Sequence, residues 1–157
     1  HDGESDKLRF PRFHGQTMKI LLAVDGSEHS ERVTAHVVKL AQGCAEHQIL
    51  LLNVQAPIAA PEVLGHMPAS EIEAMQQTRG GDAMAAARSI LDAAGIRYEP
   101  AVAIGNIAEA IVQRANDSAC DAIVVGTHGA GALRSALTGS VATEVIRHAG
   151  CPVTVVK

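Results

Sequence analysis

Apolar positions along this chain follow two patterns that alternate from residue 18 onward. Short runs of aliphatic and β-branched residues are typical of buried strands, whereas longer segments with an apolar position every three to four residues are typical of helices. The segments that predict strands are 18–24, 49–54, 97–104, 121–125 and 153–156. The segments that predict helices are 28–41, 70–94, 106–115 and 140–148. Alternating strands and helices predict right-handed crossovers and a parallel sheet covered on both faces, so the fold class is α/β.

Polar residues and glycines set the expected helix boundaries. Ser27 is a suitable N-cap for the first helix, and Ser70-Glu71-Ile72-Glu73 and Asn106 with Glu109 have capping-box spacing. Gly80-Gly81 interrupts the second helical segment, and each glycine costs about 1 kcal/mol relative to Ala inside a helix. We therefore expect a break or kink there. Residues 55–68 contain three prolines and no clear period, which predicts a loop.

Length and composition fit one domain with an aliphatic core. The chain has 157 residues, no Trp, two Phe and one Tyr, so Ala, Val, Ile and Leu must build the core. A formal net charge of −4 argues against broad nucleic-acid binding, which needs Lys and Arg to neutralise phosphates. No apolar run approaches the roughly eighteen residues of a membrane helix. The three cysteines are scattered and indicate small buried residues in a reducing cytoplasm.

The first seventeen residues differ from the rest of the chain. They are polar and contain two of the three aromatic residues, and Met18 begins a strand at once. We expect residues 1–17 to be an appended leader and 18–157 to be a single α/β domain. A native N-terminal arm is the alternative.

A glycine-rich loop follows the fourth predicted strand. The apolar run 123–125 stops at Gly126, the loop contains Gly129 and Gly139, and Ser140 opens a helical pattern. Glycines let backbone N–H groups approach an anion closely, and a helix N-terminus adds free donors and a partial positive charge. The order strand, glycine loop, helix therefore suits a phosphate site, although a simple turn has the same composition.

Two common phosphate-binding motifs are excluded. The Walker motif needs Gly-Lys followed by Ser or Thr, and no such tripeptide occurs in the sequence. Gly129-Ala130-Gly131 begins like a dinucleotide-binding motif, but Arg134 stands where the third glycine belongs. Arg134 itself fits either a phosphate contact or a solvated loop charge.

Three motifs together resemble one known family. The spacing G-x-x-G-x9-G-S from Gly126 to Ser140, MKILLAVDGSEHS at residues 18–30 and HAGCPVTVVK at the C-terminus resemble the nucleotide-binding subgroup of the universal stress protein family. The resemblance covers residues 18–157. It implies an open five-stranded parallel sheet of order 3-2-1-4-5 with helices on both faces, a Rossmann-like fold of the adenine nucleotide alpha hydrolase type. In that order strands one and four are neighbours, so their outlets at Asp25 and Gly126 meet at the switch point where such sheets bind ligands.

The same resemblance implies a set of nucleotide-binding residues. Asp25 matches the acidic residue that contacts the nucleotide, and Val54 matches the apolar residue that recognises adenine through its main chain. The remaining positions line the adenine, ribose or phosphates. The full set is Ala23, Val24, Asp25, Ser27, Val54, Gly126, Thr127, His128, Gly129, Gly139, Ser140 and Val141. From the residues alone, Asp25-Gly26-Ser27 also fits an Asx turn, and Ser140 also fits a helix cap.

The expected function is nucleotide binding rather than catalysis. The resemblance implies a cytoplasmic protein that binds ATP or AMP, with Mg²⁺ as a candidate companion of ATP, and acts in stress response or signalling. It implies a homodimer through strand 153–156 and an unidentified protein partner, with no nucleic acid or membrane. No histidine, cysteine or acidic spacing suggests a metal site. The loop lacks most parts of an efficient kinase or ATPase, so slow ATP hydrolysis is the most that we expect.

Two other functions stay open. The first is a dimeric interaction module without a nucleotide, against which the intact glycine spacing argues. The second is an enzyme that splits ATP between its α- and β-phosphates. Such enzymes carry Ser-Gly-Gly-x-Asp-Ser after the first strand, whereas residues 24–29 read Val-Asp-Gly-Ser-Glu-His and lack the glycine pair.

Overall fold

Five parallel strands form the central sheet of the protein in the order β3-β2-β1-β4-β5. The computed structural model describes residues 17–44, 46–58, 65–127 and 139–157. Its strands are β1 (Met18–Ala23), β2 (His47–Gln55), β3 (Tyr98–Ile104), β4 (Ala122–Gly126) and β5 (Val153–Val156). Neighbouring strands are all parallel. The expected fold class and strand order are therefore confirmed.

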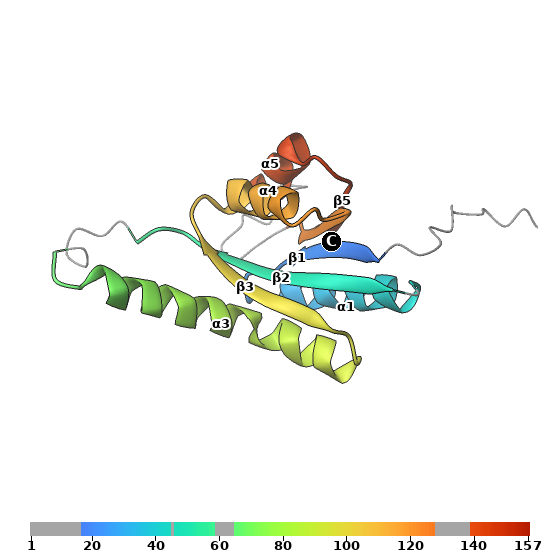
Figure 1. Cartoon of the computed structure of the whole chain (residues 1–157), viewed down its shortest axis with the longest axis horizontal. Coiled ribbons are helices and arrows are strands. Elements are labelled where there is room, and N and C mark those ends of the chain that lie inside the picture. The colour runs from blue at the N-terminus through green and yellow to red at the C-terminus, as the bar shows by residue number, and fades with distance from the viewer. Residues whose placement is uncertain (1–16, 45, 59–64, 128–138) are drawn as a thin grey trace, which may run out of the picture.

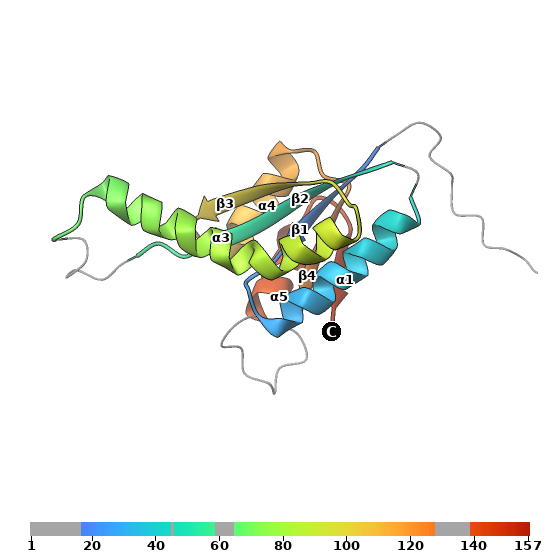
Figure 2. The same ribbon diagram turned by 90° about the horizontal axis from the view of Figure 1, so that it is seen from below.

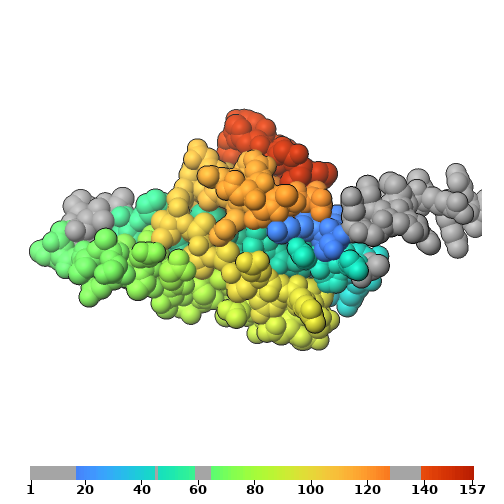
Figure 3. Space-filling view, in the orientation of Figure 1, coloured from blue at the N-terminus to red at the C-terminus, as the bar shows by residue number. Residues whose placement is uncertain are grey.

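Helices cover both faces of the sheet. They are α1 (Glu28–Gln42), α3 (Ala69–Ala93), α4 (Ile107–Asp117) and α5 (Ser140–His148). Figures 1 and 2 show α1 and α3 on one side of the sheet and α4 and α5 on the other. In the space-filling view, α4 and α5 rise as one ridge, and the amino-terminal half of α3 extends far to one side (Figure 3). In the part of the chain that is described, no helix is both long and apolar enough to cross a membrane.

Two buried clusters fill the layers between sheet and helices. Successive residues of a strand point to opposite faces, so Ile20 and Leu22 of β1 pack with α1 and α3, while Leu21 packs with α4 and α5. These three side chains are fully buried. Because both faces are covered, the central strands are continuous apolar runs rather than alternating ones.

The helix α3 runs unbroken through Gly80-Gly81, so the predicted break was wrong. Gly80 is buried against Val102 of β3. A Cβ atom at Gly80 would lie 2.5 Å from both Cγ atoms of Val102. The glycine therefore allows the helix to lie close to the sheet, and this packing outweighs its poor helix propensity.

Two of the predicted caps are confirmed, and one is wrong. The Ser27 side chain accepts a hydrogen bond from Ser30 N–H, and Asn106 Oδ1 accepts one from Glu109 N–H at 3.1 Å. The predicted capping box at residues 70–73 is absent because α3 begins one residue earlier, after Pro68. The carbonyl oxygen of Pro68 accepts the first helical N–H groups, and its fixed φ suits a residue that leads into a helix.

Candidate functional site

The carboxyl ends of β1 and β4 lie side by side in the sheet. Their register pairs Leu22 with Val124, and β1 pairs with β2 on its other edge as far as Ala23 with Leu52. The chain therefore changes direction across the sheet between β1 and β4, at the position where open α/β sheets bind ligands. The two loops that the sequence singled out, after Ala23 and after Gly126, leave the sheet at this point.

Asp25 begins a tight turn at the end of β1. Its Oδ1 accepts hydrogen bonds from Ser27 N–H at 3.0 Å and from the Ser30 hydroxyl at 2.7 Å. Its own N–H donates to Ser30 Oγ at 3.0 Å. These contacts are those of an Asx turn tied to the first turn of α1. Gly26 completes the turn with a φ of +83°, a conformation that favours glycine.

Val54 presents its main chain to the space beyond the end of β1. Val24 N–H donates to Leu52 O at 3.0 Å, so the main chain of Leu52 faces β1. Gly105 N–H donates to Gln55 O at 3.0 Å, so Gln55 faces β3. Alternation along the strand directs the main-chain groups of Val54 to the β1 side. There the register of β1 with β2 has already ended at Leu52.

A pair of amide side chains, one buried and one half-buried, reinforces the carboxyl end of β2. Asn53 is 2% exposed, and its Nδ2 donates to Val24 O at 2.8 Å. Its Oδ1 accepts a hydrogen bond from Gln55 Nε2 at 2.7 Å. This pair was not identified from the sequence, although two amides in the apolar run of β2 are a visible signal.

Thr127 and Gly139 join the two ends of the glycine-rich loop. The Gly139 N–H donates to Thr127 O, and the Thr127 N–H donates to Val156 O at 2.9 Å. Thr127 is 5% exposed. The intervening residues, including the predicted site residues His128 and Gly129 and the candidate Arg134, lie outside the described residues. The hydrogen bond nevertheless holds the end of β4 against the start of α5.

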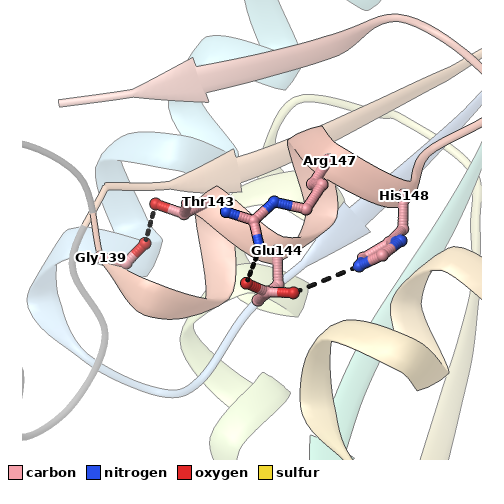
Figure 4. A network of polar contacts seen from close by, with 5 residues as sticks. All are labelled: Gly139, Thr143, Glu144, Arg147 and His148. Atoms are coloured by element: carbon pink, nitrogen blue, oxygen red, sulfur yellow. Dashed lines mark hydrogen bonds and ion pairs between the residues drawn. The ribbon is translucent and has the colours of Figure 1, made fainter.

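Gly139, and not Ser140, is the N-cap of α5, so the predicted capping role of Ser140 was wrong. Gly139 O accepts hydrogen bonds from Thr143 N–H at 3.0 Å and Thr143 Oγ1 at 3.1 Å (Figure 4). Ser140 is the first helical residue and is exposed, whereas Val141 is half-buried. The amino-terminal turn of α5 therefore begins at the predicted phosphate position, where the helix carries a partial positive charge.

The last turn of α5 carries two basic side chains, Arg147 and His148. Glu144 contacts Arg147 at 3.2 Å and His148 at 3.3 Å (Figure 4). All three side chains are exposed, so each contact adds little to stability. Basic side chains at a helix C-terminus complement its dipole.

His29 connects the two halves of the site and was not identified from the sequence. Its Nε2 lies 2.7 Å from Val156 O, 3.2 Å from Thr127 N and 3.4 Å from Thr127 Oγ1. A Cβ atom on Gly126 would lie 2.5 Å from His29 Cδ2. The helical pattern of α1 marks this histidine only as a polar residue in the first turn. Its partners become visible only once the strand order is known.

Ten of the twelve predicted site residues lie in the described part of the chain. They occupy the ends of β1, β2 and β4 and the start of α1 and α5: Ala23, Val24, Asp25, Ser27, Val54, Gly126, Thr127, Gly139, Ser140 and Val141. Described contacts join Asp25 to Ser27 and Thr127 to Gly139.

Two cavities formed by the described residues lie away from this site. Among these residues, no group of three or more His, Cys, Asp or Glu side chains could hold a metal ion. One cavity of about 460 Å³ lies between α4 and α5, and another of about 590 Å³ lies at the amino ends of β1, β2 and β3. Neither is lined by a predicted site residue. The main-chain N–H groups at the start of α5, unlike the linings of these cavities, match the chemistry of a phosphate.

Known proteins share both the sequence and the fold of this chain. The sequence model of the universal stress protein family matches residues 17–157. A universal stress protein from Thermus aquaticus is 37% identical over 139 residues, which are 88% of this chain and 97% of that protein. The solved structure of MJ0577, from Methanocaldococcus jannaschii, has a TM-score of 0.74 and 30% identity over 88% of this chain and 94% of its own.

A plant member has been solved with a nucleotide. This universal stress family protein from Arabidopsis thaliana, with AMP bound, shares the fold at a TM-score of 0.63 and 22% identity. The alignment covers 89% of this chain and 91% of the plant protein. From the family match, the similar sequences and the shared sheet order, this chain belongs to the universal stress protein family.

Proposed function

We propose that this protein binds AMP or ATP at the carboxyl ends of β1 and β4. The observation that carries the proposal is the hydrogen bond from Gly139 N–H to Thr127 O. It holds a strand end and a helix N-terminus together at the switch point of the sheet, an arrangement well suited to bind an anion. The AMP in the plant relative supports an adenine nucleotide as the ligand.

Each part of the nucleotide has proposed partners. The main-chain groups of Val54 offer a donor and an acceptor to the edge of adenine, beside the backbone of Ala23 and Val24. The Asp25 carboxylate accepts hydrogen bonds from the ribose hydroxyls. The proposed ribose contacts, taken from the family resemblance, are Gly126, Thr127, His128 and Gly129, and Ser27 N–H supports the Asp25 turn.

The phosphate partners are the first residues of α5. The Gly139 N–H already donates to Thr127 O, so the proposed donors are the N–H groups of Ser140 and Val141 and the Ser140 hydroxyl. Gly139 contributes the absence of a side chain, which leaves room for a phosphate. With ATP as ligand, Mg²⁺ would be held chiefly by the phosphates, as this ion commonly is.

The proposed biological role is a nucleotide-dependent change of conformation or partner in stress response or signalling, in the cytoplasm. A homodimer through β5 and an unidentified protein partner belong to this proposal. By strand alternation, the main chains of Val153 and Val155 face the open edge of the sheet, because Pro152 O and Val156 O accept hydrogen bonds from β4 and the loop that follows it. Slow hydrolysis of ATP is compatible with this role.

The direct test is to denature the purified protein, identify any released nucleotide by mass spectrometry, and titrate the stripped protein with AMP and ATP. We expect Asp25→Ala and Gly139→Val each to weaken binding about tenfold or more. The first loses charge-assisted hydrogen bonds, and the second places a branched side chain at the phosphate position. Gly139 has a φ of −64° and a ψ of 157°, which any residue adopts, so the valine should not distort the backbone.

Gly81→Ala is the matched control, because a Cβ atom there meets nothing within 4 Å. It should leave nucleotide affinity unchanged. A protein that carries no nucleotide and binds neither AMP nor ATP would refute the proposal, and the interaction module without a nucleotide would replace it.

A further inference from the structure

His29 extends from the first turn of α1 to the ends of β4 and β5. Its Nε2 lies 2.7 Å from Val156 O, which is a short hydrogen-bond distance for nitrogen and oxygen. Among the described residues, Val156 O is the nearest acceptor to Nε2, and an oxygen and a nitrogen at this separation need a hydrogen between them. We therefore assign the tautomer in which Nε2–H donates to Val156 O. The same carbonyl accepts Thr127 N–H at 2.9 Å. One carbonyl oxygen of the edge strand thus ties α1 to the end of β4.

The imidazole ring also explains Gly126 without reference to a ligand. A Cβ atom at Gly126 would lie 2.5 Å from His29 Cδ2, 2.9 Å from Nε2 and 3.2 Å from Val33 Cγ2. Carbon atoms do not approach to 2.5 Å without displacement of one of them. Any side chain at residue 126 would therefore displace the ring of His29 from the position in which it contacts Val156.

The neighbours of His29 belong to both halves of the proposed nucleotide site. Ser27 and Ser30, which flank it in the first turn of α1, hold the Asp25 carboxylate. Thr127, its contact on the other side, accepts the hydrogen bond from Gly139 at the start of α5. His29 is therefore the link between the ribose side and the phosphate side.

We propose that His29 is a positioning residue that fixes the Asp25 turn and the Thr127–Gly139 pair relative to each other through its hydrogen bond to Val156 O. The proposal rests on the proposed nucleotide binding for its effect on affinity, but its structural part does not. It also means that a change in the main chain of β5 at Val156 reaches the nucleotide loop through one shared carbonyl.

Two substitutions separate hydrogen bonding from packing. In His29→Gln, the side-chain Nε2–H₂ can donate from nearly the same position, whereas His29→Leu fills the space without a donor. Loss of one hydrogen bond corresponds to a change of up to about tenfold. We expect His29→Leu to bind AMP about tenfold more weakly, and His29→Gln to remain within about threefold of the native protein.

Amide hydrogen exchange, measured by NMR without nucleotide, gives a readout that does not depend on binding. The Thr127 and Gly139 amides should exchange about tenfold faster in His29→Leu and at nearly the native rate in His29→Gln. Unchanged exchange at both amides in a folded His29→Leu variant would overturn the inference. If the native protein binds no AMP while these exchange rates change as expected, the proposed function fails and the positioning role stands.

A double-mutant cycle tests the role of Gly126. Gly126→Ala should weaken AMP binding and accelerate Thr127 exchange in the native background, because it displaces the ring. In the His29→Ala background the ring is absent and only Val33 Cγ2, at 3.2 Å, stays close to the added Cβ atom, so the further effect of Gly126→Ala should be clearly smaller than in the native background. An equal effect of Gly126→Ala in both backgrounds would show that the glycine serves the ligand directly, and would contradict this explanation of Gly126.

Discussion

Individual polar groups buried among aliphatic side chains shape the carboxyl edge of the sheet. Asn53 and Thr127 are nearly inaccessible to solvent, and each is hydrogen-bonded to main-chain groups of a neighbouring strand or loop. A buried polar group that loses its partner costs about 1–3 kcal/mol. The positions of these groups are therefore fixed by the fold before any ligand arrives.

Cys120 and Cys151 precede the amino ends of β4 and β5, and their thiols should react slowly with alkylating reagents. Burial raises the pKa of both Cys120 and Cys151 above the ordinary thiol value, and the nearby Asp121 adds to the increase. Only the thiolate is nucleophilic. We expect iodoacetamide to alkylate both residues more slowly in the folded protein than in the urea-unfolded chain at pH 8, as measured by peptide mass spectrometry.

The raised thiol pKa values also determine how the stability of the protein depends on pH. The folded protein retains the thiol protons at a pH where the unfolded chain releases them, so this contribution to stability falls as pH rises above about 8.5. Alkylation of the folded protein should accelerate over the same range. Equal rates in folded and unfolded protein at pH 8 would mean that the thiols are not protected by burial.

The contacts of a residue could be predicted from the sequence only where its partner lies nearby in the chain. The Asx turn of Asp25 was predictable from the residues because its partner Ser27 is two positions away, whereas its nucleotide-binding role was implied only by the family resemblance and stays a prediction. His29 could not be identified because its acceptor, Val156, is 127 positions away. No pattern within one helix indicates such a contact.

At the scale of elements, α3 shows how packing decides the shape of a helix. Its paired glycines differ in their surroundings: Gly80 is buried against Val102 of β3, whereas Gly81 has open space beside it. The same residue type therefore has two roles in successive positions. The first lets the helix approach the sheet, and the second only weakens the helix.

Alanine at these two positions should change stability in opposite directions. Gly81→Ala should stabilise the protein by up to about 1 kcal/mol through helix propensity. Gly80→Ala should destabilise it, because overpacking costs about 1–3 kcal/mol and exceeds that gain. For a domain of this size each kcal/mol shifts Tm by about 2–4 °C, which thermal unfolding by circular dichroism resolves.

Val102→Ala provides the internal control for Gly80. In that background only the Cβ atom of residue 102 remains, 3.1 Å from the added Cβ atom, so Gly80→Ala should destabilise the protein much less than in the native background. If Gly80→Ala lowers Tm equally in both backgrounds, contact with Val102 is not the reason for the glycine.

The elements themselves were predictable because each has a local signal. The strands are continuous aliphatic runs, and Ser27 and Asn106 mark the starts of α1 and α4. The continuity of α3 was not predictable, because the reason for it lies on β3. Likewise, the start of α3 depended on Pro68 and not on the capping-box spacing that follows it.

At the scale of the whole molecule, the sheet has two edges, β3 and β5. Periodicity gives the number of strands but not their order, and here the order came from the resemblance of three motifs to a family. The short edge strand β5 is half-buried throughout. Unpaired main-chain groups at such an edge are suited to pair with a second copy of the chain.

Val155→Pro tests whether the proposed dimer uses this edge. Proline removes the outward-facing N–H of Val155 while leaving the hydrogen bonds to β4, and proline is tolerated in edge strands. We expect a dimer of the native protein to become a monomer in sedimentation velocity experiments. Val155→Thr, which keeps both the N–H group and the branched shape, should remain dimeric. A Val155→Pro variant that is still dimeric would place the interface elsewhere.

The sheet order also has a consequence for biosynthesis. Strands β1, β2 and β3 can pair as soon as they leave the ribosome, but β4 and β5 come last and pair with the oldest strand and with each other. The contacts Lys19–Asp121 and His29–Val156 span 102 and 127 positions, and contacts of such separation form late. The proposed nucleotide site therefore closes only after β5, with Val156, has been synthesised. A chain that stops before β4 would carry β1 with one unpaired edge and would lack one side of the proposed site. If the proposed binding holds, nucleotide occupancy would therefore report that β4 and β5 have paired.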